Sequence, residues 1–377
     1  METTTFSRRS VLGIGAAAAL GLTAGQLGNA TKSEAAPIPR PTGTGYVRYE
    51  DLYRAGDDLQ MVINKVTGNR VLTFPEGVFT IPSNFRYGYK DGVRLGNRSG
   101  GAGCRGLVGS GRNTIFRMAS SNQPKWTSGA SPYMLIHAIA SSADPMITVQ
   151  LRNFQIQGTN LNHEYNGLRL TRASGVVDNL YINGITGYAK IPPGETGGIS
   201  LYQCSSLKIS NTEVDGRRAG VRVSSSPIMV NNSSGITFQD CYVHHSYCGG
   251  GGIAWFESRD STVTRVRSEY IGSGPGKLSG YCFNHEQTTR ITYNSPVMIC
   301  DRITTGSNLH MSLNADAARG GTDCVLTVNN PKWDPTNVGG GKFVVETWGI
   351  KTQAQKSSPR VYGPTGAALP FTWLHPA

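Results

Sequence analysis

Short alternations of apolar and polar residues recur along the chain, and they predict β-strands rather than helices. Five of them begin with glycine and continue apolar–x–apolar, with starts 31, 22, 32 and 28 residues apart. Alternation places the first and third residues after each glycine on one face, and their apolar character predicts an interior position. These pairs are Leu168/Leu170, Ile199/Leu201, Val221/Val223, Ile253/Trp255 and Tyr281/Phe283.

A second motif lies between these segments and carries a column of asparagines. Asn153, Asn179 and Asn211 occupy the same position of the motif, and Asp240 continues the column. Short strands and turns at this period indicate the coils of a parallel β-helix, because one coil cannot bury its apolar side and must stack on others. Side chains of the column can then hydrogen-bond between coils. A β-sandwich does not predict such matched columns. The five copies are Arg152–Gly158, Asp178–Gly184, Ser210–Gly216, Gln239–His245 and Val266–Gly272.

These repeats resemble the right-handed parallel β-helix, or pectin-lyase-like, superfamily. Tyr49–Ile81 resembles its entry segment, with a short helix, a first strand and a Pro-x-Gly turn, and Gly103–Met118 resembles its early Gly-rich coil. The resemblance covers roughly residues 45 to 350. It implies an all-β, right-handed, single-stranded parallel β-helix with a short N-terminal capping helix. The superfamily contains lyases, hydrolases, epimerases and non-catalytic adhesins, so the resemblance does not fix a reaction.

The N-terminus resembles a twin-arginine export signal. Arg8 and Arg9 precede an apolar, Gly- and Ala-rich run, Val11–Gly25. We therefore predict a secreted protein without a membrane span after signal removal. The expected divisions are a signal peptide at 1–36, a linker at 37–48, a β-helix domain at 49–350 and a C-terminal cap or tail at 351–377.

The chain is basic and contains an odd number of cysteines. Its net charge is +12, and +11 without residues 1–36, which contain three basic and two acidic residues. A secreted basic protein favours an acidic polymer such as a uronic-acid polysaccharide, although a solvated basic surface without a partner is the alternative. No nucleic-acid motif is present. Seven cysteines without a zinc-type pair predict mostly small buried residues, with a Cys241–Cys248 disulfide left open.

One candidate site pairs Glu257 with His285. Each is the fifth residue after a segment glycine, so the two are predicted at equivalent turns of adjacent coils, with Glu286 next along the chain. A carboxylate orients an imidazole and suits it to general acid–base chemistry. The alternative is a structural hydrogen bond between coils. Outward positions of the same strands carry Tyr202 and Phe256, whose rings are candidates for stacking on sugars.

A rival candidate site pairs Asp215 with His244, which occupy the same position of the second motif as Gln157 and Asn183. They are therefore predicted to be neighbours on adjacent coils. The alternative is a solvated turn with an Asp–Arg pair. Arginines nearby are candidates for bidentate binding of sugar carboxylates, namely Arg217, Arg218 and Arg222.

These residues favour a carbohydrate-active enzyme that cleaves an acidic polysaccharide, by β-elimination rather than hydrolysis. Arg and His supply what a lyase needs, whereas no carboxylate pair has the spacing that defines a hydrolase. A glycoside hydrolase and a non-catalytic glycan-binding or cell-surface protein are the alternatives. The named motifs of polygalacturonases, pectate lyases and mannuronan epimerases are absent or incomplete. No dense acidic cluster supports calcium, and the sequence leaves the oligomeric state open.

Overall fold

The structure is a computed structural model, and it describes most of the chain beyond residue 36. The described residues are 37–82, 91–96, 103–118, 133–158, 165–185, 197–218, 221–222, 226–247, 251–272, 279–300, 307–314, 326–333, 343–348, 359–369 and 371–374. The predicted signal peptide, residues 1–36, lies outside them.

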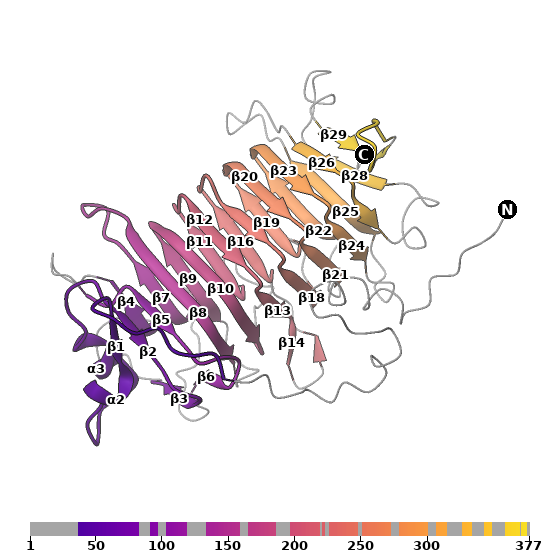
Figure 1. The fold of residues 1–377 in the computed structure, drawn as a ribbon. Helices are drawn as coiled ribbons and strands as arrows, with labels where there is room; N and C mark the ends of the chain where they lie inside the picture. Colours follow the sequence, from indigo (N-terminus) through magenta and orange to yellow (C-terminus); the bar gives the residue numbers. More distant parts are fainter. Residues whose placement is uncertain are drawn as a thin grey trace. The chain divides into compact units, whose positions relative to one another are not determined.

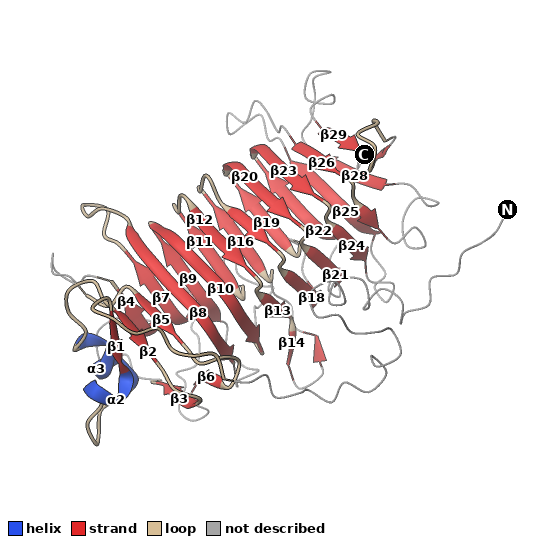
Figure 2. Ribbon diagram, viewed as in Figure 1, coloured by secondary structure: helices blue, strands red, loops and turns tan. Residues whose placement is uncertain are grey.

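Parallel pairing between successive coils organises the strands. For example, β11 (Ile199–Tyr202) pairs in parallel with β9 (Tyr165–Thr171) before it and with β16 (Ile228–Asn231) after it. Each central coil contributes three strands, and the strands of successive coils lie side by side (Figures 1 and 2). One series forms a 10-stranded sheet, and the other two share an 18-stranded sheet because long strands such as β10 (Ala173–Asn183) span both. The predicted all-β parallel β-helix is confirmed.

The remaining strands of the described chain complete these two sheets and one small hairpin. The other strands of the 18-stranded sheet are β1 (Tyr46–Arg48), β2 (Val71–Thr73), β3 (Gly77–Ile81), β5 (Gly106–Val108), β6 (Thr114–Met118), β8 (Ile147–Gln157), β12 (Leu207–Ser210), β13 (Glu213–Asp215), β17 (Thr237–Gln239), β18 (Tyr242–Tyr247), β20 (Arg259–Thr264), β21 (Arg267–Gly272), β23 (Thr289–Asn294), β24 (Val297–Cys300), β26 (Leu326–Asn329), β27 (Lys332–Trp333) and β29 (Pro359–Tyr362). The other strands of the 10-stranded sheet are β4 (Asp91–Leu95), β7 (Tyr133–Ile139), β19 (Ile253–Phe256), β22 (Ser279–Glu286), β25 (Ser307–Asn314), β28 (Phe343–Trp348) and β30 (Phe371–Leu374). The hairpin consists of β14 (Arg217–Arg218) and β15 (Val221–Arg222).

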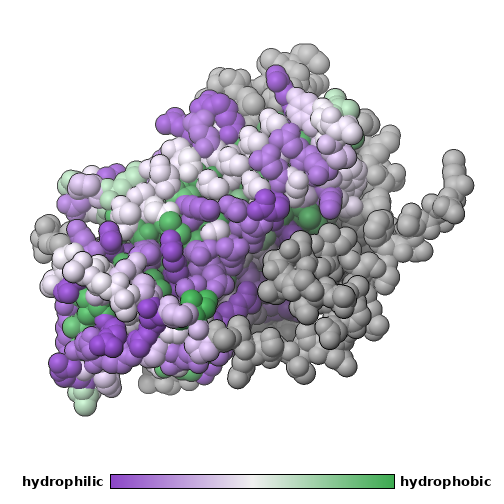
Figure 3. All heavy atoms as spheres, in the orientation of Figure 1, coloured by the Kyte–Doolittle hydropathy of each residue, from purple (hydrophilic) through white to green (hydrophobic). Residues whose placement is uncertain are grey.

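Side-chain alternation produces a continuous interior column of apolar residues. Burying each such side chain contributes roughly 1.5–3 kcal/mol relative to leaving it in water. Polar residues predominate on the face seen in Figure 3, with apolar ones scattered among them. The predicted interior residues of four of the five glycine-led segments are at most 7% exposed: Leu168, Leu170, Ile199, Leu201, Ile253, Trp255, Tyr281 and Phe283.

Residues in the left-handed backbone region turn the chain from one side of the coil to the next. Asn153, Asn179 and Asn211 have φ of 60°, 53° and 50°, and Asp240 has 54°. Asn and Asp tolerate this region better than most residues because their short side chains hydrogen-bond locally. The Asn179 amide donates to Asn153 Oδ1 at 3.0 Å. The Asn211 amide instead donates to Asp178 Oδ1 at 2.9 Å, so the predicted column is a set of corners with one amide–amide bond.

The Gly220 segment is not a strand of the coil, in contrast to the prediction. Its residues Val221 and Arg222 form β15, which pairs antiparallel with β14. The equivalent sheet strand is β16, in which Ile228 pairs with Ile199, 29 residues earlier. The short spacing of 22 residues in the sequence reflects this inserted hairpin.

Two short helices precede β2, where one capping helix was expected. They are α2 (Tyr49–Leu52) and α3 (Leu59–Asn64). Asp58 caps α3 by accepting a hydrogen bond from the Met61 backbone N–H at 2.8 Å. Leu59, Val62 and Ile63 of α3 are buried and pack into the same core as the strands.

The strand repeat begins earlier and ends later than predicted. β1 lies inside the expected linker and pairs with β2, while β29 and β30 lie inside the expected C-terminal tail and extend the two sheets. Among the described residues, no helix is long and apolar enough to cross a bilayer. Cys241 is buried with a free thiol, and Cys248 lies outside the described residues. The other cysteines with described side chains are also buried and free, namely Cys104, Cys204 and Cys282.

Candidate functional site

A polar cluster occupies the outer side of β13, β18 and β21. Val214 and Val243 belong to the hydrophobic core, so alternation directs Asp215 and His244, the next residues, away from it. Asp215 pairs in register with His244, and His244 with Glu269 of the next coil. The predicted adjacency of Asp215 and His244 is therefore confirmed.

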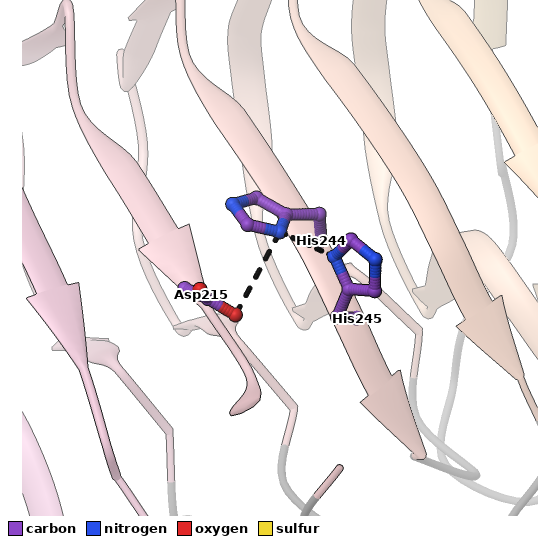
Figure 4. A group of neighbouring side chains, drawn as sticks. All are labelled: Asp215, His244 and His245. Carbon is purple, nitrogen blue, oxygen red and sulfur yellow. Dashed lines mark hydrogen bonds and ion pairs between the residues drawn. The ribbon is translucent and has the colours of Figure 1, made fainter. Parts of the chain in front are cut away.

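The His244 side chain projects from the outer face of the coil but is buried by contacts with its neighbours. Its side chain is 3% exposed, and its ring stacks on Tyr242 with centroids 4.1 Å apart. Nε2 lies 3.3 Å from Glu213 Oε1, while Nδ1 lies 2.6 Å from His245 Nδ1 and 3.7 Å from Asp215 Oδ1. Figure 4 shows the last two contacts. The imidazole thus has a fixed orientation between two carboxylates and a second imidazole.

Asp215 is an ion-pair partner of Arg217. The Arg217 backbone N–H and Nε both donate to Oδ1 at 2.9 Å, and Nη2 donates to Oδ2 at 2.8 Å. Burial raises the pKa of Asp215, but the Arg217 hydrogen bonds and the charge of His244 outweigh it, so the pKa lies below its usual range. Asp215 is therefore a carboxylate at neutral pH.

Glu213 is held in the same ionised state on the other side of His244. Arg112 Nη1 donates to its Oε2 at 2.9 Å. Burial raises the pKa of Glu213, but hydrogen bonding to His244 and the charge of Arg112 outweigh it and lower the pKa. The charge on Glu213 makes His244 Nε2 the donor of their hydrogen bond.

Glu269 and Tyr242 extend the cluster to the next coil. Tyr242 donates its hydroxyl to Glu269 Oε2 at 3.1 Å, and Arg267 Nη2 lies 2.7 Å from Glu269 Oε1. Burial, followed by the negative charge of Glu269, raises the pKa of Tyr242 well above its usual value. Tyr242 therefore remains a neutral phenol that donates a hydrogen bond to Glu269.

Asp215, His244 and His245 offer one potential metal-ligand atom each, and the three atoms lie within 4.8 Å of one another. Two histidine nitrogens on one tetrahedral ion lie about 3.3 Å apart, because each Zn–N bond is about 2.0–2.1 Å. The two Nδ1 atoms are closer, at 2.6 Å, which is the distance of a shared proton. The hydrogen bonds from Arg217 also engage both oxygens of Asp215. This geometry fits a hydrogen-bonded pair better than a metal centre.

His285 lies in the interior, so its predicted place at a turn beside Glu257 is wrong. In the pairing of β19 with β22, Trp255 lies opposite His285 and Phe256 opposite Glu286. His285 is 0% exposed, and its Nε2 lies 2.7 Å from the hydroxyl of Tyr293. β22 runs two residues further than expected, so the left-handed corner falls at Gln287, with φ of 53°.

Glu257 occupies the corner itself, with φ of 47° and an exposed side chain. Its backbone N–H donates to the Glu286 carbonyl at 2.9 Å. The half-buried side chain of Glu286 lies near Asn284, whose Nδ2 donates to Glu286 Oε1 at 3.4 Å. The expected Glu257–His285 pair is therefore not formed.

The predicted aromatic contacts lie away from the His244 cluster. Tyr202 and Phe256 are half-buried at the ends of β11 and β19, and Asn231 of β16 lies between them in register. Arg169 places its guanidinium 5.8 Å from the centre of the Tyr202 ring. The outward orientation is confirmed, but these rings follow the strands of the 10-stranded sheet rather than β13 and β18.

Of the three predicted substrate-binding arginines, only Arg217 has a described side chain. It contacts Asp215, and this Asp–Arg pair was part of the alternative stated for the site in the sequence analysis. Arg218 and Arg222 belong by their backbone to the β14–β15 hairpin, and their side chains lie outside the description. The hairpin directly follows β13 in the sequence, and all three arginines belong to it.

Sequence reasoning missed four acid, base or aromatic members of the cluster. Glu213 and Tyr242 lie two residues before Asp215 and His244, on the same face of their strands, so alternation alone was a sufficient signal. Glu269 was hidden because the segment Val266–Gly272 was aligned two residues out of register. His245 was named only as the last residue of a motif copy, and its left-handed φ of 55° could not be read from the sequence.

Comparisons with known proteins return similarity only at the level of solved structures. No protein-family model matches the chain, and no curated protein matches it. A tailspike of an Acinetobacter phage aligns at 12% identity and a TM-score of 0.49, covering 87% of this chain and 64% of its own. ORF18 of Geobacillus virus E2 aligns at 11% identity and a TM-score of 0.47, covering 88% of this chain and 62% of ORF18.

The A-module of the Azotobacter vinelandii mannuronan C-5 epimerase AlgE4 aligns at 11% identity and a TM-score of 0.41, covering 85% of this chain and 98% of the module. The chain thus spans less than two thirds of the two viral proteins. These likenesses concern the fold, which the strand pairing establishes independently.

Proposed function

We propose that this chain is a secreted enzyme that cleaves an acidic polysaccharide by β-elimination at the His244 cluster. The observation that carries the proposal is an oriented imidazole between ionised carboxylates, with three arginines at the rim. Arg112, Arg217 and Arg267 pair with the carboxylates, yet their side chains remain 49%, 41% and 28% exposed. Guanidinium groups have five donors, so these can also bind a uronate carboxylate.

The state of the carboxyl groups favours elimination over hydrolysis. A glycoside hydrolase needs one carboxylic acid that is protonated near neutral pH, with a raised pKa. The pKa values of Glu213 and Asp215 are both lowered. Neither residue is therefore suited to donate a proton, and the basic group of the cluster is an imidazole.

The reaction needs three contributions from the protein. Arginines neutralise the uronate carboxylate, which acidifies the proton on the adjacent carbon, C5. The imidazole pair removes that proton as general base, and the electron pair forms the C4–C5 double bond as the C4–O4 bond breaks. The leaving oxygen takes a proton from water.

A glycan-binding protein without catalysis is the second candidate function. It is favoured by Tyr202 and Phe256, which lie on the outer face of the 10-stranded sheet at two-coil separation. Neighbouring strands are about 4.8 Å apart, so the rings are roughly 10 Å apart along the stack. Both rings can stack on one extended sugar chain.

Cleavage assays with a panel of uronic-acid polymers separate these possibilities. We expect ultraviolet absorbance from unsaturated uronate products, and we expect His244→Ala to lose it. His137→Ala is the matched control, because His137 is a buried outward histidine that contacts Thr171 on distant strands. New reducing ends without that absorbance would indicate a hydrolase. Binding without either product would support the glycan-binding alternative.

A further inference from the structure

His244 and His245 form a chain of contacts that starts at Glu213. His244 Nε2 lies 3.3 Å from Glu213 Oε1, and His244 Nδ1 lies 2.6 Å from His245 Nδ1. The two imidazole rings meet edge to face, with centroids 4.9 Å apart (Figure 4). The three groups can therefore pass a proton along one line.

Counting protons along this line fixes the tautomers of the neutral pair. Glu213 also accepts a hydrogen bond from Arg112, so it is an acceptor, and His244 must present its N–H at Nε2. A neutral imidazole carries one N–H, which leaves the His244 Nδ1 lone pair facing His245. Two lone pairs cannot approach to 2.6 Å, so His245 donates from its Nδ1. Its basic lone pair is then on Nε2.

The backbone explains why both neighbouring histidines lie on the outer face. His245 has a φ of 55°, which interrupts the strand alternation directly after His244. Its ring stacks on that of Tyr270, which has the same φ of 55°, with centroids 4.7 Å apart. Such left-handed non-glycine residues cost of order 1 kcal/mol or more each. The stacking fixes the orientation of the His245 ring.

Exposure also distinguishes the two imidazoles. The His244 side chain is 3% exposed and its ring face is covered by Tyr242, whereas His245 is only half-buried. A polysaccharide that approaches from solvent therefore meets His245 before it meets His244.

We propose that His245, through Nε2, is the catalytic base that takes the C5 proton, and that Glu213 and His244 are positioning residues. This inference rests on the proposed elimination. As Nε2 gains the proton, the Nδ1 proton of His245 passes to His244 Nδ1. The C5–H bond breaks, C4–C5 becomes a double bond, and O4 leaves with a proton from water. The positive charge comes to rest on His244, 3.3 Å from Glu213 and 3.7 Å from Asp215.

Nitrogen NMR of the full chain with ¹⁵N-labelled histidine tests the relay without any substrate. The signals of His244 and His245 among those of the seven histidines are identified with the His244→Gln and His245→Gln variants. We expect His244 as the Nε2–H tautomer and His245 as the Nδ1–H tautomer, and Glu213→Gln is expected to release His244 into a mixture. An Nε2–H tautomer for His245 would overturn the relay. So would a change in these signals on adding EDTA, because it would mean that a metal bridges the pair.

Kinetics on a polymer that the wild type cleaves test the catalytic assignment. We expect His245→Ala to lower kcat at least about 100-fold, and Glu213→Gln to lower kcat about 10-fold with KM within twofold of wild type. His137→Ala again serves as the control. Full activity in His245→Ala together with loss in His244→Ala would overturn the assignment in favour of His244. If no polymer is cleaved, the proposed function fails, whereas the tautomer experiment still decides the relay.

Discussion

Two histidines on neighbouring sides of the β-helix have opposite environments, His244 on β18 and His285 on β22 two coils later. His285 of β22 is 0% exposed inside the coil, where Tyr293 bridges it to Trp255: the hydroxyl lies 2.7 Å from His285 Nε2 and accepts from Trp255 Nε1 at 2.9 Å. His244 of β18 lies outside the core among carboxylates and a second imidazole. One histidine fills space and satisfies buried donors, while the other is surrounded by groups that stabilise a change in its charge. A histidine beside a glutamate in sequence does not distinguish the two.

The difference arises from the position of each histidine along its strand. On β18, His244 follows the core residue Val243 and points outward, and the left-handed His245 within the same strand adds a second imidazole to that face. On β22 the corner is Gln287, and His285 falls on the inward side of a strand that has not yet ended. Strand alternation therefore decides whether a histidine faces the core or the surface, and a left-handed residue that interrupts it can add a second side chain to one face.

Removing His244 is expected to have the largest effect. We expect His244→Ala to lower the rate of polymer cleavage by about 10²- to 10⁴-fold, because His245 then loses the group that accepts its Nδ1 proton during general base catalysis. Stability is expected to fall less than in His285→Ala, since no core residue is lost. Steady-state assays and urea unfolding followed by circular dichroism measure both quantities. Unchanged activity in a well-folded variant would remove His244 from the site.

Removing His285 is expected to reverse this pattern. His285→Ala leaves a cavity in the core and deprives the Tyr293 hydroxyl of one of its two partners, at a cost of about 3 kcal/mol in the free energy of unfolding. The urea midpoint shift measures this cost, and refolded protein is expected to keep its activity per folded molecule. A loss of activity at unchanged stability would contradict the assignment of His285 to the core.

Acidification is expected to weaken the polar cluster around His244 before it affects the core around His285. The pKa values of Glu213 and Asp215 are lower in the folded protein than their usual values of 4.5 and 3.8. Their ionised forms therefore contribute stability above those values, and this contribution is lost as the pH falls through the folded pKa values. Urea midpoints between pH 7 and pH 3 test the expectation. The Glu213→Gln, Asp215→Asn double variant should lose less stability on acidification, and an equal loss would refute this origin.

Changing Glu257 is expected to have the smallest effect and the opposite sign. Glu257 is exposed at a corner with φ of 47°, a conformation in which Asn or Gly is less strained than Glu. We expect Glu257→Asn to raise the free energy of unfolding by up to about 1 kcal/mol without changing activity. Thermal unfolding and the cleavage assay measure the two. Reduced activity would restore Glu257 to the site.

The periodic features of the fold could be predicted from the sequence because each coil repeats the same physical constraint. Alternation identified Ile199 and Leu201 as interior residues, and the motif copies placed Asp215 beside His244. The errors were register shifts of two residues, at β21 and at the end of β22, and the inserted β14–β15 hairpin. A shift of two leaves the inward and outward faces unchanged, so the apolar pattern fits both registers equally well.

The sequence by itself determined the stacked coils, the inward faces and the column of asparagine corners, because these follow from side-chain alternation and backbone preferences that act locally. Only the tertiary structure decided where each strand ends and which residue takes the left-handed corner. That choice depends on hydrogen bonds between coils, such as the one from the Glu257 backbone N–H to the Glu286 carbonyl. It placed His285 in the core, and it added His245 and Glu213 to the predicted pair of His244 and Asp215 on the outer face, where a shared proton has a path.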